Sequence, residues 1–120
     1  MERLVSLMIA HVVLFAPRPN LSHDEQQALL KAFEYAVTNI PTVRRVRLGR
    51  RVRHGAGYEG RSGAAEFIAT IAFDDLAGLR AYLGHPAHEE LGRQFGTQLD
   101  VAEVYDFEEI ALDQLAQPRD

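Results

Sequence analysis

Apolar positions along the chain follow two spacings, one typical of strands and one typical of helices. Residues 6–16 form a nearly continuous apolar run, and residues 43–53 alternate apolar with polar positions. Residues 66–73 place Phe67, Ala69, Ile71 and Phe73 on one face of a further strand. Residues 101–108 complete the set near the end of the chain. The pattern therefore predicts four strands, the first of them buried.

A helix is predicted between the first two strands, from Ser22 to the residue before Pro41. Ser22 and Glu25 have the spacing of a capping box, in which each residue satisfies a free backbone amide of the other. Proline at position 41 cannot continue the helix. The inward face of this helix carries apolar residues at helical spacing: Leu29, Leu30, Phe33, Ala36, Val37 and Ile40.

A second helical segment follows the third strand and begins after Asp74 or Asp75, either of which can cap it. Pro86 interrupts this segment, and a new helical piece starts there because proline suits a first turn. Its inward residues are Leu91, Phe95 and Leu99. The glycine-rich residues 54–63 predict a long loop that could act as a mobile flap.

The element order is β-α-β-β-α-β, the split βαβ pattern of a ferredoxin-like α+β fold with a four-stranded antiparallel sheet. The helices cover one face of such a sheet, and the apolar residues of the other face need a cover as well. A second copy of the chain is the simplest cover, which predicts a homodimer whose sheets form an α/β barrel. We expect one domain over residues 1–110 and a frayed tail over residues 111–120.

Composition narrows the functional classes. The 120 residues have a formal net charge of -4, which argues against a dedicated nucleic-acid binder, and they include no cysteine, which fits a cytoplasmic protein. The apolar run at residues 4–15 is too short to span a bilayer, so we interpret it as a buried strand rather than a membrane segment.

Several short stretches together resemble one known family. Residues 82–88 read Y-L-G-H-P-A-H, residues 11–15 read H-V-V-L-F, and residues 104–107 read V-Y-D-F. Ile40-Pro41 also stands ahead of a strand that carries Val46 and Gly49. Over about residues 10–108 the chain is similar to the stress-responsive dimeric A/B barrel (Dabb) family.

The resemblance implies a homodimer that holds a small aromatic or polyketide-like ligand between sheet and helices, without a cofactor. A plant member of the family closes a linear polyketide into an aromatic ring, and its working tyrosine and histidine match Tyr82 and His88. His11 and His85 match two further histidines of that enzyme, and Asp106 matches its final-strand aspartate. The longer glycine-rich loop and the arginines of the second strand depart from that enzyme.

These residues suit proton transfer next to a carbonyl group. His88 has an ordinary pKa near 6.5 and can act as a general base, while Asp106 could fix its tautomer. The Tyr82 hydroxyl could donate to a developing oxyanion. Candidate ligand-binding residues are His11, Phe33, Val37 and His85. This set predicts either a cofactor-free cyclase or lyase, a cofactor-free monooxygenase, or a dimer that only binds its ligand.

Two plainer interpretations of the same residues stay open. His85 and His88 could cap the helix break through their ring nitrogens, with Tyr82 as an ordinary core aromatic. His85 and His88 with Glu89 could also hold zinc or iron, but Pro86 separates the two histidines, so we expect no metal site.

Six arginines lie close together in the second strand and just after it: Arg44, Arg45, Arg47, Arg50, Arg51 and Arg53. They predict a charged edge strand that discourages stray pairing and is balanced by nearby acidic residues. The alternative is a patch for anions, although it lacks the aromatic residues that single-stranded nucleic acids need. Arginines near the mouth of the barrel could attract a ligand that carries a carboxylate.

Overall fold

The computed structural model describes residues 8–116. Their elements follow the predicted order: β1 (Ile9–Pro17), α1 (His23–Asn39), β2 (Arg45–Arg50), β3 (Phe67–Phe73), α2 (Leu76–Leu83), α3 (Pro86–Gln98) and β4 (Leu99–Glu108). Short 3-10 helices lie at Gly57–Arg61 and Leu112–Ala116. Residues 6 and 7, the predicted start of the first strand, lie outside the described residues.

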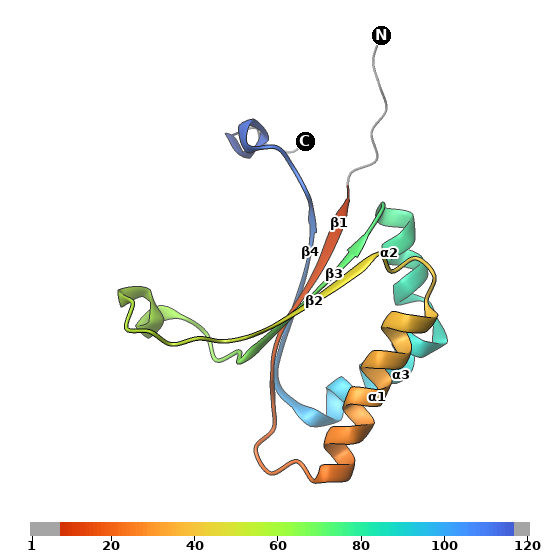
Figure 1. Cartoon of the computed structure of the whole chain (residues 1–120), viewed down its shortest axis with the longest axis vertical. Coiled ribbons are helices and arrows are strands. Elements are labelled where there is room, and N and C mark those ends of the chain that lie inside the picture. Colours follow the sequence, from red (N-terminus) through yellow and green to blue (C-terminus); the bar gives the residue numbers. More distant parts are fainter. Residues whose placement is uncertain (1–7, 117–120) are drawn as a thin grey trace.

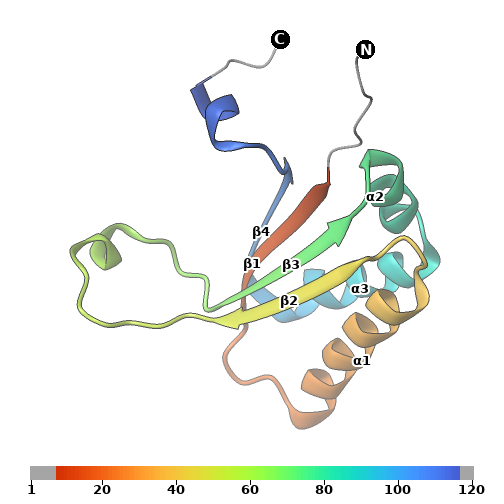
Figure 2. The same ribbon diagram turned by 45° about the horizontal axis from the view of Figure 1, so that its top comes forward.

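The four strands form one antiparallel sheet in the order β2-β3-β1-β4, the arrangement of a ferredoxin-like fold. All three α-helices of the described chain lie on one side of this sheet (Figures 1 and 2). β1 and β3 are the central strands, while β2 and β4 form the two edges. Residues 8–116 therefore form two layers, and within them nothing covers the sheet face away from the helices, here called the outer face (Figure 1).

The core lies between the sheet and the helices. Its largest fully buried side chains are Tyr82, Phe73 and Ile71. Ile9 on β1 and Leu79 on α2 belong to the same cluster. The odd-numbered residues of β1 and β3 face the helices, as the period of two in a strand requires. This dense cluster fixes α2 and the start of α3 against one end of the sheet.

The predicted helix boundaries are confirmed by their caps. The Ser22 hydroxyl accepts the Glu25 amide at 3.1 Å, and the Glu25 carboxylate accepts the Ser22 amide at 2.9 Å. Asp75, rather than Asp74, caps α2 by accepting the Gly78 amide at 2.9 Å. Pro86 occupies the first turn of α3, with His85 as its N-cap residue. Each helix thus begins at the capping residue or proline that the sequence indicates.

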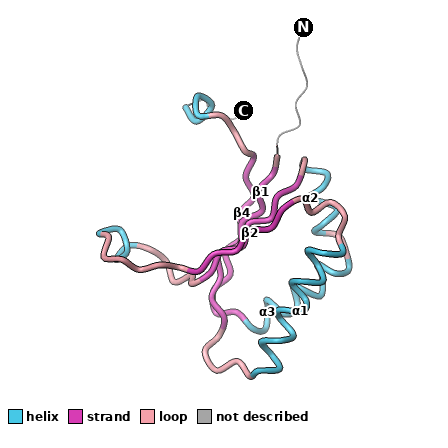
Figure 3. Tube along the Cα trace, viewed as in Figure 1, coloured by secondary structure: helices cyan, strands magenta, loops and turns pink. Residues whose placement is uncertain are grey.

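The second strand is shorter than predicted, and the chain after it forms an arm over residues 51–66. This arm extends away from the helix layer (Figures 1 and 3). Glu59 braces its tip by accepting the amides of His54 and Gly55 at 2.8 and 3.1 Å. Arg53 forms a bidentate ion pair with Glu66 at 2.6 and 3.1 Å. The glycine-rich segment is therefore cross-linked by side chains and contains the 3-10 helix Gly57–Arg61.

The C-terminal segment also differs from the sequence expectation. Residues 112–116 of the predicted frayed tail form a 3-10 helix, on the same side of the sheet as the arm (Figure 3). No helix among residues 8–116 has the length and apolar character needed to cross a bilayer.

Candidate functional site

The register of the two neighbouring strands places His11 beside Asp106. His11 on β1 pairs with Asp106 on β4, and both side chains belong to the helix-facing side of the sheet. The His11 Nδ1 atom lies 2.6 Å from Asp106 Oδ1. The histidine side chain is 5% exposed and the aspartate side chain 43%. A mostly buried imidazole is thus held in one orientation by a carboxylate that still contacts water.

Tyr82 lies at the centre of this end of the core. Its ring contacts His11 edge-on at 5.7 Å between ring centres, and Phe73 at 5.2 Å. Burial raises the pKa of Tyr82 to about 12, because the apolar surroundings disfavour a phenolate. Among the described residues, no side chain or carbonyl accepts a hydrogen bond from its hydroxyl. The phenol therefore stays protonated at neutral pH and keeps a donor to offer.

His88 in the first turn of α3 contacts the other side of Tyr82, with ring centres 4.8 Å apart. Burial lowers the pKa of His88 below its ordinary value of 6.5, and the nearby His11 lowers it further. A backbone hydrogen bond with Leu83 opposes this shift, as does the negative charge of Glu89. His88 is therefore neutral at neutral pH, which is the form that a general base needs.

The structure corrects one expected pairing and places another residue in a structural role. Asp106 bonds to His11 rather than to His88, because the strand register sets it opposite His11. His85 lies outside this contact chain, and its Nδ1 accepts the Ala87 amide at 3.0 Å at the start of α3. The capping interpretation thus holds for His85. His11, Tyr82, His88 and Asp106 form one cluster, here called the polar cluster.

An apolar pocket of about 650 Å³ lies at the opposite end of the helix layer. Four of the six phenylalanines of the chain line it, among them Phe33 of the predicted ligand-binding residues. Phe15 joins Phe67 and Phe95 there, at 5.6 and 5.7 Å between ring centres. The aliphatic and polar lining residues are Pro17, Arg18, Asn20, Leu21, Gln26, Leu29, Leu30, Leu48, Gly49, Arg50 and Ile68.

This pocket lies between the sheet and the helices, where the sequence predicts the ligand, but of the four predicted ligand-binding residues only Phe33 lines it. Neither Tyr82 nor His88 lines it, and Val37, a predicted ligand-binding residue, packs against the buried core instead. The sequence puts Phe67 on an apolar face of the third strand and Phe95 on the inward face of the last helical piece, but it does not predict that they line a pocket. The only signal in the sequence that could have indicated this pocket was the presence of phenylalanines near the ends of the predicted strands and helices. The gap itself depends on how α1 and the sheet diverge.

Partners within residues 8–116 hold three of the six clustered arginines: Arg44, Arg51 and Arg53. Arg44 pairs with Asp74 at 2.7 Å, and Arg51 donates to the carbonyls of Gly63 and Ala65 at 2.5 and 3.1 Å.

Residues 8–116 include no group of three or more His, Asp or Glu side chains that could hold a metal ion.

Comparison with known proteins identifies the family. The family model of the stress responsive A/B barrel domain matches residues 9–109. The chain belongs to the stress responsive A/B barrel domain family. The polar cluster and the apolar pocket both lie within the matched residues of this A/B barrel domain. A search of curated proteins gives no match.

Solved structures share the same fold. A hydroxynitrile lyase from Passiflora edulis aligns with a TM-score of 0.73 and 14% identity, over 87% of this chain and 94% of its own. A Dabb family protein from Mesorhizobium loti aligns with a TM-score of 0.67 and 20% identity, over 88% and 100%. A dimeric ferredoxin-like protein from Thermobifida fusca gives 0.66 and 21%, over 87% and 92%. At these identities the likeness shows the fold alone.

The lowered pKa of His88 predicts a specific pH dependence of stability. Below pH 6.5 the unfolded chain takes up a proton at this residue more readily than the folded chain, so protonation favours unfolding. We expect the stability advantage of the native chain over His88→Gln to shrink as the pH falls from 7.5 to 5.0. Urea unfolding at both pH values measures it.

The exposed His23→Gln substitution is the matched control for the loss of one imidazole. An advantage over His88→Gln that grows toward pH 5.0 would contradict the assigned direction of the His88 shift.

Proposed function

We propose that this A/B barrel domain is a homodimer that binds a small apolar molecule between α1 and the sheet. The observation that carries the binding proposal is the apolar pocket, whose volume of about 650 Å³ falls within the range of small-molecule sites. Its phenylalanines offer large apolar surface, and burying such surface is the main source of affinity for an apolar ligand.

The pocket proposal predicts that one added side chain blocks binding. Leu48 lines the pocket but is 67% exposed, so Leu48→Trp should fill the opening without disturbing the core. We expect the neutral fluorescent probe N-phenyl-1-naphthylamine to bind the native chain and to bind Leu48→Trp roughly tenfold more weakly. Fluorescence titration gives both affinities.

Leu76→Trp is the matched control, because Leu76 lies on α2 outside the pocket and is 46% exposed. Failure of the native chain to bind the probe, or equal weakening by both tryptophans, would remove the pocket proposal.

The outer face of the sheet supports the homodimer. Alternation along the strands places Val12, Leu14, Ile68, Tyr105 and Phe107 on this face. Ile68, Tyr105 and Phe107 are 37%, 48% and 54% exposed in the single chain. A second copy laid sheet to sheet would bury this apolar surface. The relative from Thermobifida fusca is itself described as dimeric.

A charge at the centre of the outer face should break the dimer. Val12 lies between Thr70 and Tyr105 in the sheet, so Val12→Glu would bury a carboxylate in the proposed interface. We expect the native chain to sediment at twice the mass of the 13.4 kDa chain and Val12→Glu to sediment as a folded monomer.

Leu76→Glu places the same charge on the helix side and should leave the dimer intact. Sedimentation of the native chain as a monomer, or an undisturbed Val12→Glu dimer, would contradict this arrangement.

The polar cluster favours acid–base catalysis as a second candidate function. Neutral His88 can accept a proton, and the protonated Tyr82 can donate to an oxyanion. His11, fixed by Asp106, supports the Tyr82 ring from its edge. The solved structure from Passiflora edulis that shares this fold is named as a hydroxynitrile lyase. In such a reaction the base takes the hydroxyl proton, and the carbon–carbon bond breaks to give a carbonyl compound and cyanide ion. The protonated base then returns the proton to cyanide, which leaves as hydrogen cyanide.

Mandelonitrile tests this second candidate, because its cleavage releases benzaldehyde, which absorbs in the ultraviolet. We expect turnover by the native chain, with a loss of roughly 100-fold or more in His88→Ala, the size typical of a lost general base. His85→Ala, which removes a helix cap outside the cluster, should retain most of the activity. Equal losses in both variants would remove His88 as the base.

A further inference from the structure

The charged side chains that line the apolar pocket are all of one sign. Within the described part of the chain, Arg18 and Arg50 are the two charged lining residues, and no aspartate or glutamate accompanies them. Neutral Asn20 and Gln26 are the remaining polar lining residues. A ligand that enters this pocket therefore meets apolar surface and positive charge, and no negative charge in the lining offsets it.

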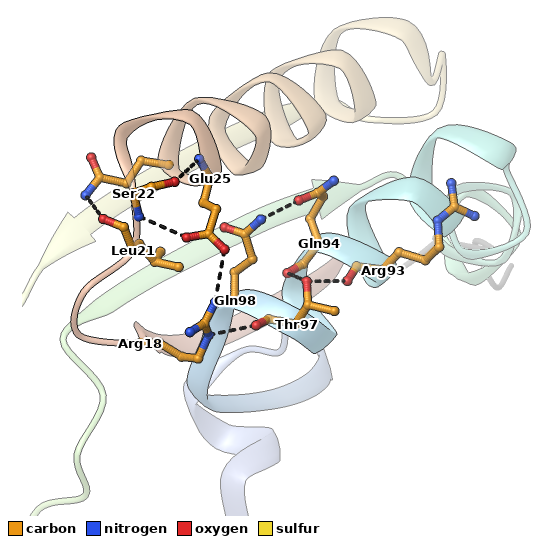
Figure 4. A network of polar contacts seen from close by, with 9 residues as sticks. Arg18, Leu21, Ser22, Glu25, Arg93, Gln94, Thr97 and Gln98 are labelled. Carbon is orange, nitrogen blue, oxygen red and sulfur yellow. Dashed lines mark hydrogen bonds and ion pairs between the residues drawn. The ribbon is translucent and has the colours of Figure 1, made fainter.

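Arg18 is already engaged by the protein. Its Nε donates to the Thr97 carbonyl at 2.8 Å, and its guanidinium forms an ion pair with Glu25 at 3.3 Å (Figure 4). Its backbone amide also donates to the Gln98 carbonyl at 2.8 Å. Arg18 thus connects the β1–α1 loop to the start of α1 and the end of α3. Its guanidinium is already paired with Glu25 and bonded to the Thr97 carbonyl.

Arg50 is the unpaired cation of the pocket. It is the last residue of β2, pairs with Phe67 across the sheet, and shares the helix-facing side of the strand with Leu48. Its guanidinium has no ion pair or hydrogen-bond partner within residues 8–116. The neighbouring Arg51 and Arg53, by contrast, are held by carbonyls and by Glu66.

We propose that the pocket binds an amphiphilic anion, a molecule with an apolar body and one carboxylate, and that Arg50 binds the carboxylate. The inference rests on the proposed function of the pocket and names the chemical class of its ligand. A guanidinium presents two parallel N–H donors that match a carboxylate. The aromatic lining would contact the apolar body, while the positive charges of Arg18 and Arg50 disfavour cationic ligands.

The same strand supplies a matched control. Arg47 lies on the outer face of β2, three residues from Arg50, and it does not line the pocket. Substituting either arginine by glutamine removes one positive charge from the same edge strand. Any effect of overall charge on an anionic ligand therefore applies to both variants, and an effect of direct contact applies to Arg50→Gln alone.

The test is isothermal titration calorimetry of the full chain with decanoate and with decan-1-ol, which share one apolar body and differ in charge. We expect the native chain to bind decanoate roughly fivefold more tightly than decan-1-ol, which is the upper end for one exposed charged contact. Arg50→Gln should lose that preference and keep its affinity for decan-1-ol, whereas Arg47→Gln should behave as the native chain.

The outcomes separate this inference from the proposed function beneath it. Equal affinity of the native chain for both compounds would overturn the anion assignment and leave an apolar pocket in place. Equal loss of decanoate binding in Arg47→Gln and Arg50→Gln would also overturn it, because general charge would then explain the preference. Failure of both compounds to bind, together with failure of the neutral naphthylamine probe, would remove the pocket itself.

Discussion

The packing of three helices on one face of a four-stranded sheet decides what each part of this molecule can do. At one end of the layer the packing is dense, with Phe73 and Tyr82 almost without exposed surface. At the other end α1 and the sheet leave a pocket of about 650 Å³ lined by phenylalanines. Close packing fixes side chains in single positions, and an apolar gap leaves room for a ligand. The fold thus separates a rigid polar cluster from a receptive apolar pocket.

Burial in the dense end also determines the chemistry of the polar cluster. His11 is accommodated there because Asp106 on the next strand satisfies one of its ring nitrogens at 2.6 Å. The same apolar surroundings raise the pKa of Tyr82 and lower that of His88. Both shifts favour the uncharged form of each group. A neutral base beside a protonated phenol thus follows mainly from burial, which is the largest cause of both pKa shifts.

Much of the fold could be predicted from local patterns, because strand alternation, the Ser22 capping box and the Pro86 break each act within a few residues. The His11–Asp106 pair could not be predicted in this way, because the two residues are 95 apart in the chain and meet only through the register between β1 and β4. The position of the pocket also depends on three-dimensional divergence of α1 from the sheet. The bracing of the 51–66 arm by Glu59 was missed because glycine content predicts a loop but not its side-chain contacts.

The distance between the two parts limits any ligand that would use both. Phe15 in the pocket and His11 in the polar cluster are four residues apart on β1, which corresponds to about 13 Å along a strand. Val13 and Ala69, both buried, lie between them on the helix-facing side. A ligand held at Arg50 could therefore present to His88 only a group at its far end, and the intervening side chains would have to move. An anion in the pocket and a reacting carbon at His88 thus require an elongated molecule.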